Sequence, residues 1–309
     1  MERFAEFMPA AIVALWALAA ALIGGYAGGI AREITYVTLA DGRREARSIP
    51  LLLKLLLPLA PNLTRFAMRP AFDRARERAD SMILMAGLEG LIDGREFIAL
   101  KILSPTVFGT CSAAFVLSMA ALIGEGSFIS DNAASLAAVG FIYFYAYPLM
   151  WLRKAVKARH ASIMRSLPFV LDLLTLSVEA GMDFMSALQR NCERRRMDPL
   201  NEELLRMIRE IQVGTPRRVA LANMAARAGQ GDLKSVANAL IQADELGVSM
   251  GAILRIQSDQ LRSRRFDRAE RLANEAPVKM LGPLLLFIFP AVFVILLGPV
   301  LAKAAGLFF

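Results

Sequence analysis

Four long stretches of this chain contain no charged residue, and charged residues flank each of them. They cover residues 7–31, 102–124, 132–152 and 280–302. About 20 helical residues are enough to cross the hydrocarbon core of a bilayer, which is roughly 30 Å thick. The pattern therefore predicts four transmembrane helices. The leader before the first stretch is acidic on balance, so we expect this span to remain as an anchor rather than to be removed as a signal peptide.

Residues 153–279 show a different pattern, in which apolar residues recur at helical spacing. Residues that end helices divide this segment at Gly181, Gly214, Gly229 and Gly247. Residues that begin helices stand at Asp183, Asp198-Pro199, Thr215-Pro216, Asp232 and Ser249. These start and stop signals predict six helices with short connections, and the last helix runs to about Glu275. Such helices would pack as a compact antiparallel bundle.

The other long polar segment, residues 32–101, is less regular. Residues 51–60 are mostly apolar but too few to cross a bilayer, so we expect them to lie in the membrane interface or against the bundle. Residues 72–101 predict two helices, broken around Gly87 and Gly94. The predicted fold class is an all-α integral membrane protein with four transmembrane helices and a six-helix bundle.

Basic residues are distributed one-sidedly along the chain. Residues 32–101 hold 12 Lys and Arg, residues 153–279 hold 22, and residues 125–131 hold none. Loops rich in Lys and Arg stay in the cytoplasm. We therefore expect both basic segments to be cytoplasmic, with residues 125–131 and both termini outside. The formal net charge of +8 also favours contact with anionic lipids or acidic partners.

The predicted spans contain packing features but no Asp, Glu, Lys, Arg or His, which argues against an ion-coupled carrier. Two overlapping small-residue pairs in the first span would allow close helix approach, although small residues are common in membrane helices generally: Gly24, Gly25, Gly28 and Gly29. The last span contains Pro283 and Pro290, and we expect a bend near Pro290 because proline removes a helical hydrogen bond.

The sequence offers little catalytic or metal-binding chemistry. No glycine-rich loop ends in Gly-Lys-Ser/Thr, so the phosphate-binding loop of ATPases is missing. Two cysteines and one histidine are too few for a Cys/His zinc site. His160 lies in a basic stretch and is expected to face solvent or lipid headgroups. We predict no catalytic residue, no cofactor, no metal and no enzyme activity.

Clusters of charged residues suggest that the protein binds partners rather than catalyses a reaction. Arg264, Arg268 and Arg271 share one face of the last bundle helix, which is either a docking stripe or a solvated face that meets anionic lipids. Asp183 is best explained as a helix cap. No aromatic interleaving or recognition motif accompanies the basic residues, so nucleic acid is not an expected partner.

Several short segments of the sequence resemble those of a known family. Residues 167–174 (LPFVLDLL), 179–182 (EAGM) and 242–247 (QADELG) are similar to the F-domain of type II secretion and type IV pilus platform proteins. Two segments near the end of the chain, 276–280 (APVKM) and 283–290 (PLLLFIFP), resemble platform proteins of the Tad (tight adherence) pilus branch. They are more similar to the TadC-type platform protein than to the TadB-type. The resemblance covers about residues 160–300.

The resemblance implies a non-enzymatic platform in the bacterial inner membrane, working as a homo- or hetero-oligomer. Its implied partners are a cytoplasmic hexameric secretion ATPase, a homologous TadB-type platform protein, pilin subunits and membrane lipids. A second interpretation is a membrane-anchored signalling or regulatory protein whose bundle binds a soluble partner. A membrane enzyme or carrier is the third.

The motor can reach only cytoplasmic surface, so we expect docking at the end of the bundle far from the membrane. If the helices alternate in direction, three turns fall at that end: residues 181–183, 214–218 and 247–249. Arg217 and Arg218 would give this end positive charge that could pair with acids of the motor, with Asp183 beside them. A solvated loop without a partner is the alternative, and the Arg264–Arg271 stripe is the next candidate.

Overall fold

The structure is a computed structural model. It describes the chain except residues 1–35, 39–43, 47–48, 58–67, 124–127 and 305–309. The first predicted span, with Gly24, Gly25, Gly28 and Gly29, lies outside the described residues. The described part is helical apart from one short antiparallel ribbon, formed by β1 (Tyr36–Thr38) and β2 (Arg44–Ala46). The sequence analysis did not predict this ribbon.

The first segment contains the two helices expected for residues 72–101. α4 (Asp73–Ala86) follows the 3-10 turn η2 (Pro70–Phe72) and ends at Gly87, which adopts the left-handed conformation that glycine tolerates. α5 (Gly94–Ser104) begins with a capping box of Asp93 and Glu96. The short α2 (Leu51–Leu56) packs against α5, with Leu53 and Leu56 buried. Residues 51–60 were expected in the membrane interface or against the bundle; the described part of this stretch packs against α5 of the first segment instead.

Three helical stretches of the described chain are long and apolar enough to cross a membrane: 94–121, 133–179 and 250–300. They contain or overlap the predicted spans at 102–124, 132–152 and 280–302. The first stretch passes from α5 through a π-helical turn, η3 (Pro105–Gly109), into α6 (Thr110–Ile123). The short α7 (Phe128–Asp131) then leads into α8 (Ala133–Glu179), which is 47 residues long.

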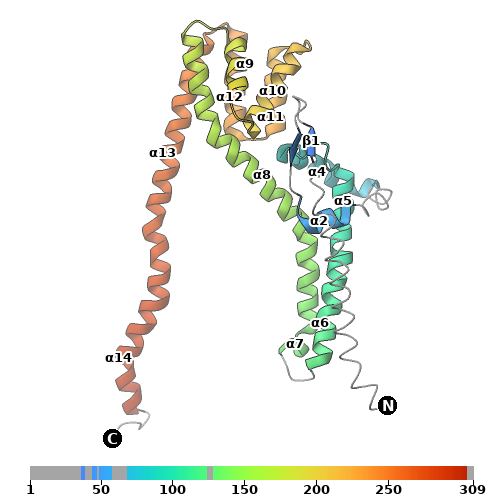
Figure 1. Cartoon of the computed structure of the whole chain (residues 1–309). Helices are drawn as coiled ribbons and strands as arrows, with labels where there is room; N and C mark the ends of the chain where they lie inside the picture. Colours follow the sequence, from blue (N-terminus) through green and yellow to red (C-terminus); the bar gives the residue numbers. More distant parts are fainter. Residues whose placement is uncertain (1–35, 39–43, 47–48, 58–67, 124–127, 305–309) are drawn as a thin grey trace.

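The bundle is built around the second half of α8 (Figure 1). It adds α9 (Phe184–Arg194), α10 (Pro199–Gln212), α11 (Arg217–Ala228), α12 (Gly231–Leu246) and the start of α13 (Met250–Pro283). Each of the six helices contributes a side chain at most 2% exposed to one core: Ile163, Leu188, Leu200, Leu221, Leu233 and Leu254. Removal of this apolar surface from water is the main driving force for packing.

The last bundle helix differs from the expectation. Among the described residues after Leu261 none is buried, so α13 belongs to the bundle for only its first three turns and then leaves it. The reason lies in its sequence, because the next two positions on the face that carries Leu254 and Leu261 are Arg265 and Arg268. α13 continues as one helix through η4 (Leu284–Ile288) to α14 (Phe289–Ala304).

The prolines of the last span coincide with a change of helix type. η4 is a π-helical turn that begins directly after Pro283 and ends two residues before Pro290. Pro290 has no N–H for the carbonyl four residues earlier, and its ring crowds that carbonyl. A wider π turn accommodates such a local mismatch. The irregularity thus lies just before Pro290.

Candidate functional site

Three turns meet at one end of the bundle. The guanidinium of Arg217, at the start of α11, lies 5.7 Å from the ring centre of Phe184 at the start of α9. Arg217 Nη1 also lies 3.3 Å from Asp244 Oδ1, near the end of α12. The turns before α9, α11 and α13 therefore lie together, at the end of the bundle opposite to α6 and α14 (Figure 1). We call them the distal turns.

The residues predicted for docking divide into engaged and exposed ones. Asp183 is a helix cap, accepting from the backbone N–H of Met185 at 2.9 Å and of Ser186 at 3.3 Å. Arg217 is held by Asp244 and Phe184, whereas Arg218 is exposed. Of the predicted docking residues at this end, Arg218 is the one best placed to meet a partner.

Sequence reasoning missed the apolar side chains at this end. Val213, at the end of α10, is 89% exposed, and Leu246, the last residue of α12, is 76% exposed. Val248 in the following turn is also exposed. A signal was available, because helical periodicity places Val213 and Leu246 away from the apolar faces of α10 and α12. Exposed apolar groups rimmed by charge are typical of protein–protein contact surfaces.

The arginine stripe of α13 is bound within the chain. Arg264 Nη1 lies 2.8 Å from Asp232 Oδ1, and Arg268 Nη2 lies 3.1 Å from Asp232 Oδ2. We call these three residues the Asp232 clasp. It fastens α13 to the start of α12 at the point where α13 leaves the bundle. Arg271, one turn further on, is exposed.

Asp232 does not cap α12 as expected. Gln230 is the capping residue, and its side-chain oxygen accepts from the N–H of Leu233. Asp232 lies in the first turn of α12 and is 7% exposed. Burial alone raises the pKa of this carboxyl, but hydrogen bonds from Arg268, Arg264 and Gln230 outweigh burial and lower the pKa below its ordinary value. The carboxylate is therefore charged at neutral pH.

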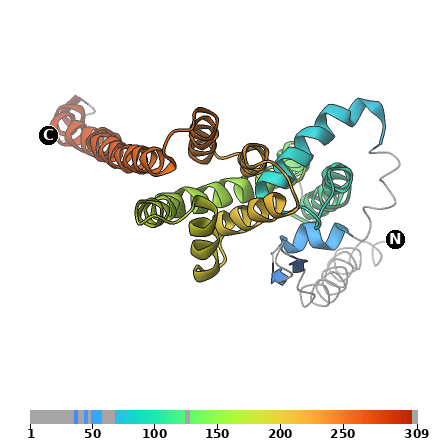
Figure 2. The same cartoon turned by 90° about the horizontal axis from the view of Figure 1, so that it is seen from above.

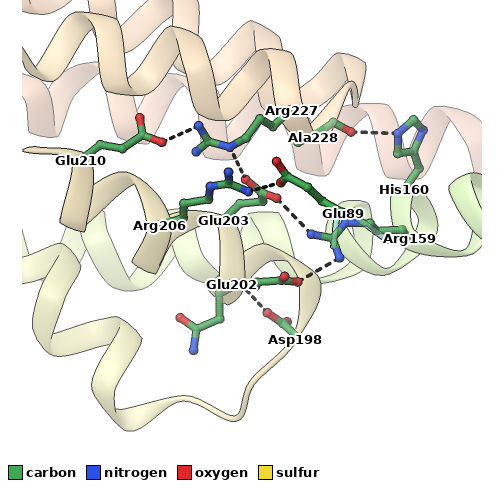
Figure 3. A network of polar contacts seen from close by, with 11 residues as sticks. Glu89, Arg159, His160, Asp198, Glu202, Glu203, Arg206, Glu210, Arg227 and Ala228 are labelled. Carbon is green, nitrogen blue, oxygen red and sulfur yellow. Dashed lines mark hydrogen bonds and ion pairs between the residues drawn. The ribbon is translucent and has the colours of Figure 1, made fainter. Parts of the chain in front are cut away.

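A second ionic network joins α8, α10 and α11 (Figure 3). Arg159, on α8, is 6% exposed; its Nη1 lies 2.9 Å from Glu202 Oε2 and its Nη2 lies 3.0 Å from Glu203 Oε1. Glu203 Oε2 also accepts from Arg227 Nε at 3.0 Å, and Arg227 Nη1 contacts Glu210. Buried charges are tolerated when they are paired in this way. The network fixes how the three helices lie relative to one another.

The first segment docks onto this side of the bundle. Glu89, in the loop after α4, lies 2.7 Å from Arg206 of α10. A Cβ at Gly229 would come within 2.9 Å of three side-chain atoms of Met85, so α4 packs closely against the turn after α11. The expectation that His160 faces solvent or headgroups is wrong: its Nε2 lies 2.9 Å from the carbonyl oxygen of Ala228 and donates to it (Figure 3).

The described residues contain no cluster of three or more His, Cys, Asp or Glu that could hold a metal. Cys111 and Cys192 are both free thiols. Burial raises the pKa of Cys192 to about 12, so this thiol is uncharged and a poor nucleophile at neutral pH.

Comparison with known proteins gives one match. Residues 170–298 match the family model described as type II secretion system (T2SS), protein F. The matched segment runs from the last quarter of α8 to α14 and includes the distal turns and the Asp232 clasp. This match supports the T2SS F-domain family for this part of the chain. No significant match is found among curated proteins or among solved structures.

Proposed function

We propose that this chain is the inner-membrane platform protein of a Tad-type, type IV-like pilus assembly machine related to type II secretion. The observation that carries the proposal is the F-domain match over residues 170–298, which falls on a helical bundle joined directly to apolar, membrane-length helices. In this role a cytoplasmic secretion ATPase supplies work from nucleotide hydrolysis. The platform passes the resulting motion to pilin subunits in the membrane.

The architecture suits the transmission of force. α8 and α13 each run without interruption from the bundle into an apolar stretch, so movement of the bundle reaches the membrane along stiff helices. Arg159 binds α8 to α10, and the Asp232 clasp binds α13 to α12. These ionic contacts would keep the bundle from shearing when one end is pushed.

The finer assignments rest on the sequence. The sequence segments 276–280 and 283–290 support the TadC-type branch, with a TadB-type platform protein as the membrane partner. The distribution of Lys and Arg supports a cytoplasmic bundle with both termini outside. Reporter fusions at residues 128 and 230 should report outside and inside, respectively. An inside result at residue 128 would overturn the proposed topology.

We place the docking surface for the ATPase at the end of the bundle that carries Val213, Leu246 and Arg218. Their exposure supports this placement. Arg218→Glu combined with Leu246→Ser should weaken co-purification with the ATPase and reduce fibre assembly, while expression and membrane insertion stay normal. Reversal of Arg217 is a poorer probe, because this residue also holds Asp244 and Phe184 in place.

Arg196→Glu is the matched control, because Arg196 lies in the turn at the opposite end of the bundle. It should leave co-purification unchanged. Equal loss of binding in the control and in the Arg218/Leu246 variant would mean that net charge, not this surface, decides binding. Unchanged binding in the Arg218/Leu246 variant, at low and physiological salt alike, would move the docking surface elsewhere.

A further inference from the structure

Apart from polar contacts that its first arginines make with α8 and α12, the part of α13 between the bundle and the membrane is exposed within the described chain. Phe266 is 77% exposed and Leu272 is 65% exposed. Residues 262–279 contain nine charged side chains, so this stretch lies outside the hydrocarbon core rather than among lipid tails. A single helix that projects through water with such exposed apolar residues is unusual for a stable fold.

One face of this stretch carries a regular apolar stripe. Its residues are separated by alternating steps of three and four: Phe266, Ala269, Ala273, Ala276 and Met280. This is the a and d spacing of a two-stranded coiled coil, and alanine at these positions allows two backbones to approach closely. We call these five residues the α13 stripe.

The Asp232 clasp determines which way the stripe faces. Arg264 and Arg268 turn toward α12 to reach Asp232. The α13 stripe lies about 140° away from them around the helix axis, because an α-helix has about 3.6 residues per turn. The stripe therefore faces away from α12, and α13 diverges from the membrane part of α8 in both views (Figure 2).

We propose that the α13 stripe is the contact between two copies of this chain, which form a short parallel coiled coil just above the membrane. Copies inserted in the same membrane have the same orientation and hold the stripe at the same height above the bilayer. Two such helices can pair only in parallel and in register. Membrane tethering favours this pairing, because it raises the effective concentration of the two stripes.

The charges beside the stripe fit a parallel pair. Arg265 precedes Phe266 and occupies a g position, while Glu270 follows Ala269 and occupies an e position. In a parallel coiled coil a g residue meets the e residue of the next heptad on the other helix, so Arg265 of one copy meets Glu270 of the other. Arg265 Nη2 donates to the carbonyls of Met164 and Arg165, and the guanidinium has further N–H donors for the second contact.

Cysteine cross-linking of the full chain in membrane vesicles tests the proposal. Cys111→Ser removes the one partly exposed native thiol, and the buried Cys192 can stay. With the same added oxidant to take up the two electrons of each disulfide, Ala269→Cys, Ala273→Cys and Ala276→Cys should give disulfide-linked homodimers about tenfold faster than the control variants, because only they hold two thiols together. The controls, Arg271→Cys and Glu275→Cys, lie on the same exposed stretch but on other faces of the helix.

A charge exchange provides a second measurement. Glu270→Arg should slow cross-linking through Ala273→Cys, and adding Arg265→Glu should restore it, because the opposite charges are then exchanged between the two copies. Glu275→Arg, away from the predicted pair, should have no such effect. Cross-linking that is equal on all faces, a double variant that is no faster than Glu270→Arg, or adducts formed only with a different protein would overturn the proposal. None of these measurements depends on pilus assembly, so they stand apart from the proposed function.

Discussion

α8 and α13 are the two longest described helices, and they differ in how closely other helices pack against them near the membrane. α8 is contacted along its length, by α4, α5, η3 and α6 near the membrane and by α9, α10, α12 and α13 in the bundle. α13 is buried only as far as Leu261. The most apolar window of the stretch 250–300 has none of its residues buried inside the molecule. Two helices that both join the bundle to the membrane therefore differ in whether described parts of the same chain pack against them near the membrane.

Small residues account for the close contacts of α8. A Cβ at Gly109 would come within 2.7 Å of the ring of Phe141, and one at Gly140 within 2.8 Å of Ser112 Oγ. Side chains this small let the backbones of membrane helices approach. A Cβ at Gly282 or Gly298, before and in α14, would meet no neighbouring atom within 4 Å. Hydropathy identifies both spans, but it does not reveal that described helices surround the glycines of one span and not those of the other.

The largest expected effect is a difference in unfolding free energy between substitutions in the upper and the lower half of α13. Leu254 is fully buried, so Leu254→Ala should lower the free energy of unfolding by about 2–5 kcal/mol. Leu272→Ala removes the same atoms from a side chain that is 65% exposed, and its effect should stay within about 0.5 kcal/mol. Thermal unfolding of the purified chain in detergent measures both. A similar loss in the two variants would show that the lower half of α13 is packed in the isolated chain.

The second prediction concerns the glycines of the two spans. Gly109→Ala should lower stability by about 1–3 kcal/mol, because the added methyl group overlaps the ring of Phe141. Gly298→Ala meets no neighbour and should be neutral or stabilising by up to about 1 kcal/mol, since alanine favours the helix. Thermal stability in detergent again gives the comparison. Equal destabilisation would mean that α14 is as closely packed as α6 and α8.

The third prediction concerns the Asp232 clasp, which keeps the start of α13 on the bundle. Asp232→Asn keeps the shape but removes the charge that Arg264 and Arg268 bind, and it should cost about 1–3 kcal/mol. The pKa of Asp232 is lowered in the folded state, so the clasp stabilises above the unfolded-state pKa and this contribution is lost as the pH falls through the lowered pKa. The difference in stability between wild type and variant should thus begin to shrink below about pH 4 and vanish only below the lowered pKa of Asp232. A constant difference at all pH values would show that the charge is not responsible.

Most helix boundaries of the bundle were predictable, because local chemistry decides them. Asp183 and Asp198-Pro199 begin helices, and Gly229 and Gly247 end them in the left-handed conformation, as the sequence indicated. What the sequence did not reveal is where α13 leaves the bundle. Helical periodicity continues past Leu261, and only the tertiary structure shows that no described part of the chain covers it.

The candidate site was less predictable, because charged residues were judged without their partners. Arg264 and Arg268 were expected to meet solvent, lipid or a docking partner, yet both bind Asp232 of the same chain. Arg159 was counted only among the 22 Lys and Arg of residues 153–279, and it proves to be the buried centre of a network. Such long-range pairs join helices that are distant in sequence, so no local pattern announces them.

The smallest predicted effect tests whether a surface ion pair holds the first segment against the bundle, beside α8. The Glu89–Arg206 pair connects the loop after α4 to α10, but its side chains are 54% and 40% exposed. A double-mutant cycle of Glu89→Gln and Arg206→Gln should therefore give a coupling free energy of only about 0.2–1 kcal/mol, which added salt reduces further. A coupling well above this range would assign the docking of the first segment to charge. A small coupling free energy leaves the packing of α4 and Met85 against Gly229 as the main contact. Apolar packing against described parts of the chain is then what α8 has near the membrane and what the lower half of α13 does not.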